Sequence, residues 1–341
     1  MAPCLPTTDG LKILMEPCPC ATCHCRTWVL VCGLRSCPGA GPVPGHYVPQ
    51  LAELIYEGNK GASRDRAISI KGFMIGNAVL NDATDQLGMV EYAWSHAIIS
   101  DELYSAVRRE CDSFKEEADS GRPGKGCSPA LRAFLGAYDD IDIYSIYTPT
   151  CLLLNNEEWH RLMKRVPAGY DPCTEAYVTK YFNRGDVQRA LHANRTRLPY
   201  PYSPCSEVIR KWNDSPATVL PILKKLMAAG LRVWVYSGDT DGRVPVTSTR
   251  YSINTMGLRP RRQRAAASAS AGSVAAPEWG RRGTTAGGRV AGWAVEYEEG
   301  LTLVTVRGAG HQVPLFAPDR SLAMLYHFLR GQALPAARSS G

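Results

Sequence analysis

The stretch from Leu231 to Pro245 reads LRVWVYSGDTDGRVP, and it decides the fold class. Its first six residues hold one arginine among apolar and aromatic side chains, a pattern typical of a strand buried on both faces of a sheet. The residues before it predict a helix, because Pro221 suits a first turn and Gly230 suits a C-terminal cap. Its apolar side is Leu223, Leu226 and Met227. A helix that leads through a glycine into a buried strand favours an α/β fold.

Further strands and helices are expected on either side of this stretch. Two apolar, β-rich runs predict strands, Ile68 to Ile75 (ISIKGFMI) and Leu301 to Val306 (LTLVTV). Ser100 suits the N-cap of a helix. That helix would carry one apolar face: Leu103, Val107, Cys111 and Phe114. A closing helix over Pro318 to Arg330 would point its larger apolar residues inward: Leu322, Leu325, Phe328 and Leu329. The alternation predicts a mostly parallel sheet with helices on its faces.

Chemistry-bearing residues follow two of the predicted strands. Asp239 and Asp241 come after Tyr236, and His311 comes after Val306. Reactive groups of open α/β sheets lie just past the carboxyl ends of strands. An acid followed by a histidine in this order matches the end of an α/β-hydrolase triad, in which the histidine is the general base and the acid orients it. The alternatives are an Asp-x-Asp turn or cation site, and a histidine that only caps a loop.

Four motifs in the same order resemble the plant serine carboxypeptidases, most closely the two-chain type. They are GHYVPQLA (45–52), KGFMIGNA (71–78), YSGDTD (236–241) and GAGH (308–311). The resemblance covers residues 45–257 and 291–331. It implies an α/β-hydrolase fold with a helical insertion at about residues 100–175, and removal of C-terminal residues from peptides at acidic pH. It also implies a vacuolar or extracellular location, and no cofactor. Asp241 matches the family's catalytic acid and His311 its catalytic histidine.

The chain departs from the family at the nucleophile. The family's elbow reads Gly-Glu-Ser-Tyr-Ala-Gly-His-Tyr-Val-Pro, and on that alignment Pro42 stands at the serine and Gly41 at the glutamate. Proline carries no nucleophile, and loss of a triad nucleophile costs about 10⁶-fold in rate. Gln312 follows the histidine where the family often has glutamate, and it is the candidate substrate-binding residue. An upstream Asn-Gly-Gly-Pro-Gly element is absent, so we expect the domain to lack its first sheet strands.

These departures leave three functions open. The first is a serine carboxypeptidase by descent, inactive as written. The second is a non-catalytic relative that binds peptides through the surviving cleft. The third is an acyltransferase, since relatives on this fold transfer acyl groups with the same triad. Peptides are the expected partners, and a homodimer is left open.

The cysteines indicate an oxidising compartment. There are twelve, of which seven lie in the first 37 residues. The resemblance implies disulfides Cys111–Cys127 and Cys151–Cys173, with Cys205 left as a free thiol; the alternative is that all are buried free cysteines. Asn194 begins an Asn-Arg-Thr sequon and is a candidate glycosylation site. The Cys18-to-Cys25 cluster lacks the spacing of common zinc sites, so no metal is expected.

Two segments look foreign to the family. Residues 1–44 are rich in cysteine, proline and glycine, and their short apolar run from Trp28 to Leu34 is not a convincing signal peptide. Residues 258–290 are of low complexity and basic. Both have the composition of translated GC-rich non-coding sequence, as mis-joined exons would give; a basic nucleic-acid tail is the alternative for the second.

Composition excludes several classes of protein. The chain of 341 residues is 45% hydrophobic and 21% charged, as in globular proteins. Its formal charge is +7, but residues 259–289 contribute seven arginines and one glutamate. The remainder is therefore nearly neutral, which argues against a nucleic-acid-binding body. No apolar run approaches the roughly 18 residues of a membrane span, so no membrane association is expected.

Overall fold

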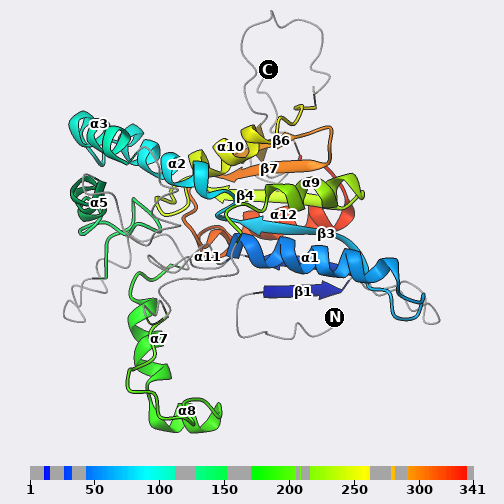
Figure 1. Ribbon diagram of the computed structural model, residues 1–341, viewed down its shortest axis with the longest axis horizontal. Coiled ribbons are helices and arrows are strands. Elements are labelled where there is room, and N and C mark those ends of the chain that lie inside the picture. Colours follow the sequence, from blue (N-terminus) through cyan, green and yellow to red (C-terminus); the bar gives the residue numbers. More distant parts are fainter. Residues whose placement is uncertain are drawn as a thin grey trace, which may run out of the picture.

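The computed structural model describes residues 11–15, 27–32, 44–111, 127–151, 170–204, 208, 216–261, 278–280 and 290–335. Its strands form one seven-stranded sheet in the order β1-β2-β3-β4-β7-β6-β5 (Figure 1). They are β1 (Leu11–Met15), β2 (Thr27–Cys32), β3 (Ser69–Gly76), β4 (Arg232–Gly238), β5 (Glu278–Gly280), β6 (Val290–Glu296) and β7 (Leu301–Val306). Strands β2, β3, β4 and β7 run parallel, and the remaining neighbours pair antiparallel. This architecture confirms the predicted α/β-hydrolase class.

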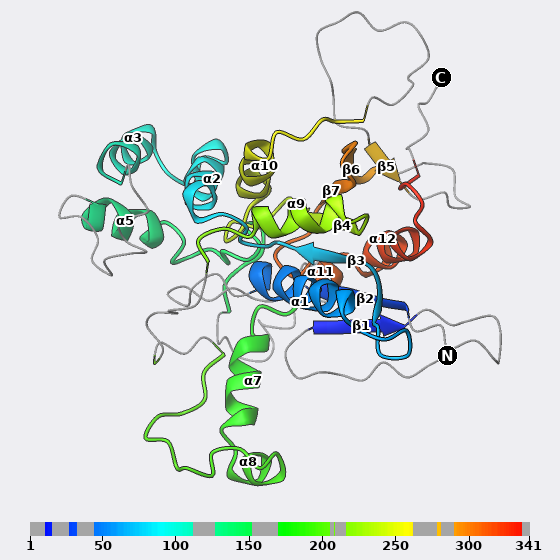
Figure 2. The ribbon, with the colours of Figure 1, turned by 45° about the vertical axis from the view of Figure 1, so that its right-hand side comes forward.

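Alternation along the central strands sends their side chains to two hydrophobic cores. Val233 and Val235 of β4 pack into one core, and Trp234 and Tyr236 pack into the other. The first core lies under α1 (Pro44–Lys60), α9 (Leu220–Ala228) and α10 (Val246–Thr255). The second lies under α11 (Val313–Phe316) and α12 (Pro318–Arg330). Helices therefore cover both faces of the sheet, as Figures 1 and 2 show.

A helical insertion interrupts the sheet between β3 and β4. Helices α2 (Asp82–Ser95), α3 (Asp101–Glu110) and α5 (Cys127–Gly136) share a third core, in which Val107 and Cys111 are buried. Ser100 caps α3, since its side-chain oxygen accepts a hydrogen bond from Leu103 N at 3.3 Å. Disulfides join Cys111 to Cys127 and Cys151 to Cys173. Helices α7 (Thr174–Phe182) and α8 (Gly185–Ala190) form an arm that projects from the sheet in both views (Figures 1 and 2).

Residues 1–44, which look foreign to the family in sequence, contribute two strands to the sheet. Strand β2 pairs with β3 in parallel, and β1 pairs with β2. The two segments read LKILM and TWVLVC, and the second holds most of the short apolar run from Trp28 to Leu34. An unpaired β3 edge would expose a row of backbone donors and acceptors. Residues 27–32 satisfy that edge, at the position of a strand that would lead into the nucleophile.

Two smaller expectations also change. The segment 258–290 is not wholly outside the sheet, because β5 lies within it and β6 begins at its last residue, Val290. On α12, Phe328 is buried and Leu325 and Leu329 pack against the second core, as predicted, and Met324 joins them. Only Leu322 is wrong, since it is 68% exposed and lies one turn before the exposed Tyr326.

Several other predictions fall outside the described residues: Phe114, Cys205 and the Cys18–Cys25 cluster. Among the helices that are described, none is both long and apolar enough to cross a membrane.

Candidate active site

Two loops leave the carboxyl ends of neighbouring strands and meet. Gly238, the last residue of β4, pairs in register with Val306, the last residue of β7. The loop after β4 carries Asp241, and the loop after β7 carries His311. The backbone N–H of Thr240 donates to the Ala309 carbonyl at 3.0 Å, which fixes one loop against the other. Strand pairing thus brings together two residues that lie 70 positions apart in the sequence.

Asp241 and His311 form a buried pair. His311 Nδ1 lies 2.7 Å from Asp241 Oδ2, and both side chains are fully buried. An ionised carboxylate only accepts hydrogen bonds, so Nδ1 carries the proton and Nε2 is left as the basic nitrogen. The second oxygen, Oδ1, accepts from the backbone N–H of Arg243 at 2.8 Å. Both carboxylate oxygens are therefore engaged, and the carboxylate cannot rotate away from the imidazole.

Asn77 is a third member of this arrangement, which the sequence analysis did not assign to the site. It follows β3, and its Nδ2 donates to Asp241 Oδ2 at 2.6 Å. Its Oδ1 accepts from Gly238 N at 3.2 Å, so one amide holds both the acid and the strand end that carries it. Its φ is +46°, in the left-handed region that asparagine tolerates better than most residues. A sequence signal could have identified Asn77 as a site residue. Gly76-Asn77 directly follows a buried strand, at the sheet edge where reactive groups gather.

Asp239, the other acid of the loop, does not contact the histidine. Its Oδ1 accepts from Gly308 N at 2.6 Å, and its backbone carbonyl accepts from the Tyr92 hydroxyl at 2.6 Å. Burial raises the pKa of Asp239, with the backbone hydrogen bonds acting in the opposite direction. Asp239 therefore braces the two loops, and the geometry favours Asp241 as the partner of His311.

The insertion covers the pair. His311 N donates to the Tyr144 carbonyl at 2.8 Å, and the Tyr144 ring lies 5.3 Å from the imidazole, centroid to centroid. Gly242 N donates to Ile143 O at 2.9 Å. These contacts exclude water from the pair, and hydrogen bonds between charged groups are stronger in such surroundings.

A second buried acid, Asp85, connects the segments that carry the site residues. Asp85 Oδ2 accepts from Leu80 N at 2.6 Å, and its Oδ1 accepts from the Ser252 hydroxyl at 2.5 Å. These bonds tie the segment after Asn77 to α10, the helix that follows the Asp241 loop. Burial raises the pKa of Asp85 to about 7.

The nucleophile position, Pro42, lies outside the described residues, but both of its flanks are described. Strand β2 ends at Cys32, and α1 begins at Pro44. A Cβ at Gly45 would overlap the carbonyl oxygen of Val79, so only glycine lets α1 approach the segment after β3 this closely. Burial lowers the pKa of the neighbouring His46 to about 4.

The hydrogen bonds found for the remaining candidates are made away from the pair. Gln312 is half-buried and precedes α11, where its backbone carbonyl accepts from Leu315 N at 2.8 Å. Asn194 lies on the projecting arm, where its amide Nδ2 donates to Gln188 and its Oδ1 accepts from Leu198 N. The described residues contain no group of three or more side chains that could hold a metal ion. Chemically, a histidine held in this way by a carboxylate can act as a general base.

The chain is similar in sequence to plant serine carboxypeptidases. Serine carboxypeptidase-like 35 of Arabidopsis thaliana is 53% identical over 311 residues, covering 86% of this chain and 60% of that protein. Serine carboxypeptidase 24 of the same plant is 45% identical, covering 85% of this chain and 60% of that protein. Serine carboxypeptidase II-1 of Hordeum vulgare is 42% identical, covering 85% of this chain and 84% of that protein. The chain thus spans about 60% of the length of the two Arabidopsis relatives.

The fold is also that of a solved structure, the prohormone-processing carboxypeptidase Kex1(delta)p of Saccharomyces cerevisiae. The TM-score is 0.58 at 17% identity, with 84% of this chain and 60% of that chain covered. A sequence profile described as serine carboxypeptidase matches residues 44–331. On this match and the plant relatives, the chain belongs to the serine carboxypeptidase family.

Proposed function

We propose that this chain holds the acid–base half of a peptide-hydrolysing serine carboxypeptidase, and that it lacks the nucleophile. The observation that carries the proposal is the buried 2.7 Å contact between His311 Nδ1 and Asp241 Oδ2 at the ends of two paired strands. In a serine carboxypeptidase such a histidine takes the proton of the attacking hydroxyl and later gives it to the leaving amine. Asp241 would stabilise the imidazolium formed between those two steps.

The nucleophile is the missing part of this mechanism. Pro42 stands where the family has serine, and no proline atom can attack a peptide carbonyl. With a base but no nucleophile, the chain as written would bind peptides without cleaving them. Gln312, next to His311, is the residue that we propose to contact the substrate's terminal carboxylate. An amide would donate an N–H to that carboxylate, whereas a glutamate would have to be protonated to do so.

The disulfides indicate where such a protein would work. Cys111–Cys127 and Cys151–Cys173 would not persist in a reducing cytosol. We therefore propose the secretory pathway, vacuolar or extracellular. A glycan on Asn194 and a homodimer remain predictions, which deglycosylation followed by mass spectrometry and light scattering of the purified chain would test.

A fluorophosphonate probe tests the proposal, because it labels an activated serine covalently. We expect no labelling of the chain as written. We expect labelling of the double variant Gly41→Glu/Pro42→Ser, and its loss when His311→Gln is added. The matched control is Gly41→Glu alone, which restores no nucleophile and should stay unlabelled.

Two results would contradict the proposal. Labelling of the unaltered chain would show that another serine is activated, and the binding-only interpretation would be wrong. A folded Gly41→Glu/Pro42→Ser variant that resists the probe would show that position 42 does not face His311. If the labelled variant turned over an acyl-glucose ester and not a peptide, the acyltransferase alternative would replace the peptidase.

A further inference from the structure

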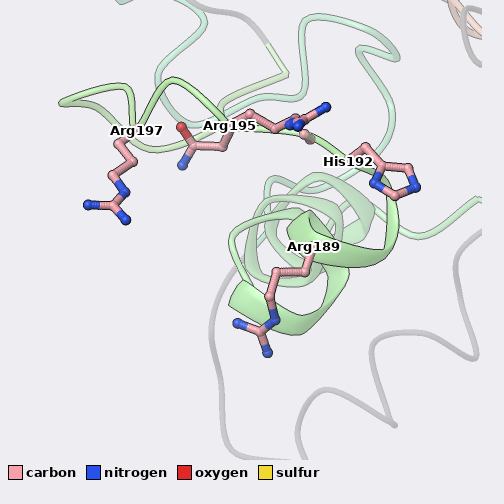
Figure 3. Close-up of a pocket in the computed structure, with 6 residues that line it drawn as sticks. Arg189, His192, Arg195 and Arg197 are labelled. Carbon is pink, nitrogen blue, oxygen red and sulfur yellow. The ribbon is translucent and has the colours of Figure 1, made fainter.

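The projecting arm carries a pocket outside the candidate active site. It has a volume of about 490 Å³ and is lined by Arg189, His192, Ala193, Asn194, Arg195 and Arg197 (Figure 3). Arg189 belongs to α8, and the other five residues follow that helix. The lining thus includes three arginines and a histidine, and no acidic residue. The chemistry of this lining is that of an anion-binding surface.

The backbone of the pocket is held in an unusual conformation. His192, Asn194 and Arg197 have φ values of +53°, +51° and +53°, a region that residues with a side chain seldom adopt. Such conformations persist only where the surroundings fix them, and they gather at functional sites. Here Asn194 fixes the loop: its Nδ2 donates to Gln188 Oε1 at 3.1 Å, and its Oδ1 accepts from Leu198 N at 2.8 Å. A rim that is ordered before binding reduces the entropy lost on binding.

The arginines of the rim are available to a ligand. Arg184, one turn before Arg189, pairs with Asp186 at 2.6 Å. By contrast, no carboxylate among the described residues pairs with Arg189, Arg195 or Arg197. In Figure 3 these three side chains point in different directions around the pocket and do not converge. A single phosphate could not reach all three, whereas a chain of separated anionic groups could.

Exposed apolar side chains lie next to the pocket residues in the sequence. Leu191, Leu198 and Tyr200 are 55%, 47% and 40% exposed. Arginine and tyrosine are the residues most enriched where proteins bind one another. A nucleic acid would instead call for several aromatic rings stacked between the cations. The mixture of cations and apolar side chains therefore favours a polypeptide ligand.

We infer that this pocket binds an extended acidic polypeptide segment, whose successive carboxylates pair with Arg189, Arg195 and Arg197. An apolar side chain of the same segment would rest on Leu198 and Tyr200. The inference goes beyond the proposed function, because the arm shares no residue with the Asp241–His311 pair. It is incompatible with the glycan predicted on Asn194, which would fill the pocket, so finding that glycan on the mature protein would overturn it. It holds whether or not the chain ever cleaves a peptide.

Fluorescence anisotropy with a labelled octaglutamate peptide and the full chain tests the inference. The test variant is Arg195→Gln/Arg197→Gln. The matched control is Arg64→Gln/Arg66→Gln, which removes two exposed arginines at the same spacing on another surface. Exposed arginine–carboxylate pairs are weak individually, so we expect the test variant to bind about tenfold more weakly and the control to bind unchanged. We also expect binding to weaken as the salt concentration is raised from about 20 to about 200 mM, because salt screens exposed charge pairs.

Three results would overturn the inference. Equal affinities of the test variant and the control would place the binding elsewhere. An octalysine peptide that bound as tightly as octaglutamate would remove the role of charge. An eight-residue single-stranded oligonucleotide that displaced the peptide at lower concentration would identify a general polyanion surface. Unchanged circular dichroism and melting temperature of both variants would exclude misfolding as the cause.

Discussion

Asn77 holds two parts of the candidate site at once, so replacing it tests the geometry directly. Asn77→Ala removes the donor to the buried Asp241 carboxylate and the acceptor for Gly238 N. A hydrogen bond to a charged group contributes about 1.5–3 kcal/mol, and an orphaned buried N–H costs about 1–3 kcal/mol. Alanine at a φ of +46° adds about 1 kcal/mol. We expect a loss of about 4 kcal/mol in the free energy of unfolding, a large fraction of the 5–15 kcal/mol typical of a domain.

Urea denaturation followed by tryptophan fluorescence measures this loss. Asn77→Gly loses the same two hydrogen bonds without the backbone penalty, so it should be about 1 kcal/mol more stable than Asn77→Ala. Asn59→Ala is the matched control, because Asn59 also makes two hydrogen bonds, both to Ile68, on an exposed surface. Its loss should be about 1 kcal/mol. If Asn77→Ala were no more destabilising than Asn59→Ala, the buried network around Asp241 would not exist as described.

Three further predictions follow from other parts of the fold. Gly45→Ala should cost more than about 3 kcal/mol by overlap with backbone, whereas Gly58→Ala in the same helix, with open space around it, should gain about 0.5–1 kcal/mol; urea midpoints of the two variants compare them. Burial raises the pKa of Asp85 to about 7, so the folded state binds its proton more tightly than the unfolded state does. Its contribution to stability is therefore complete below about pH 4 and is lost as pH rises through 7. Stability curves of wild type and Asp85→Asn between pH 4 and 8 should diverge in that window, and parallel curves would contradict the assignment. On α12, Met324→Ala should cost about 2–5 kcal/mol and Leu322→Ala less than about 0.5 kcal/mol in thermal unfolding, and the reverse order would restore the stripe predicted from sequence.

Local patterns were enough to predict the centre of the sheet. The runs at 231–236 and 301–306 carry strong strand signals, and glycine-rich loops with acid and histidine follow them directly. Because both strands are parallel and adjacent, their loops meet at one edge. The approach of Asp241 to His311 therefore follows from topology once the two strands are recognised.

Features that depend on distant partners were harder to predict. Nothing near Asn77 in the sequence shows that its amide meets a carboxylate 164 positions away. The strands at 11–15 and 27–32 are short and lie among cysteines and prolines, and they join the sheet only through the pairing of β2 with β3. The inward side of α12 is set by how the helix sits on β4 and β7, and several apolar residues on the helix leave more than one rotation acceptable. In each case the structure depends on contacts with residues distant in sequence, which the local sequence pattern does not specify.

The joining of β4 to β7 also determines how much extra chain this fold tolerates. Asp241 and His311 lie 70 positions apart in the sequence, and residues 262–289 account for 28 of those positions. In the unfolded chain, the entropy lost on closing a loop grows only with the logarithm of the loop's length, so these extra positions add about 0.5 kcal/mol to the cost of bringing the pair together. Such a small cost is far below the stability of a domain. The length of the chain between α10 and β6 can therefore vary by tens of residues while β4 and β7 still pair in the same register.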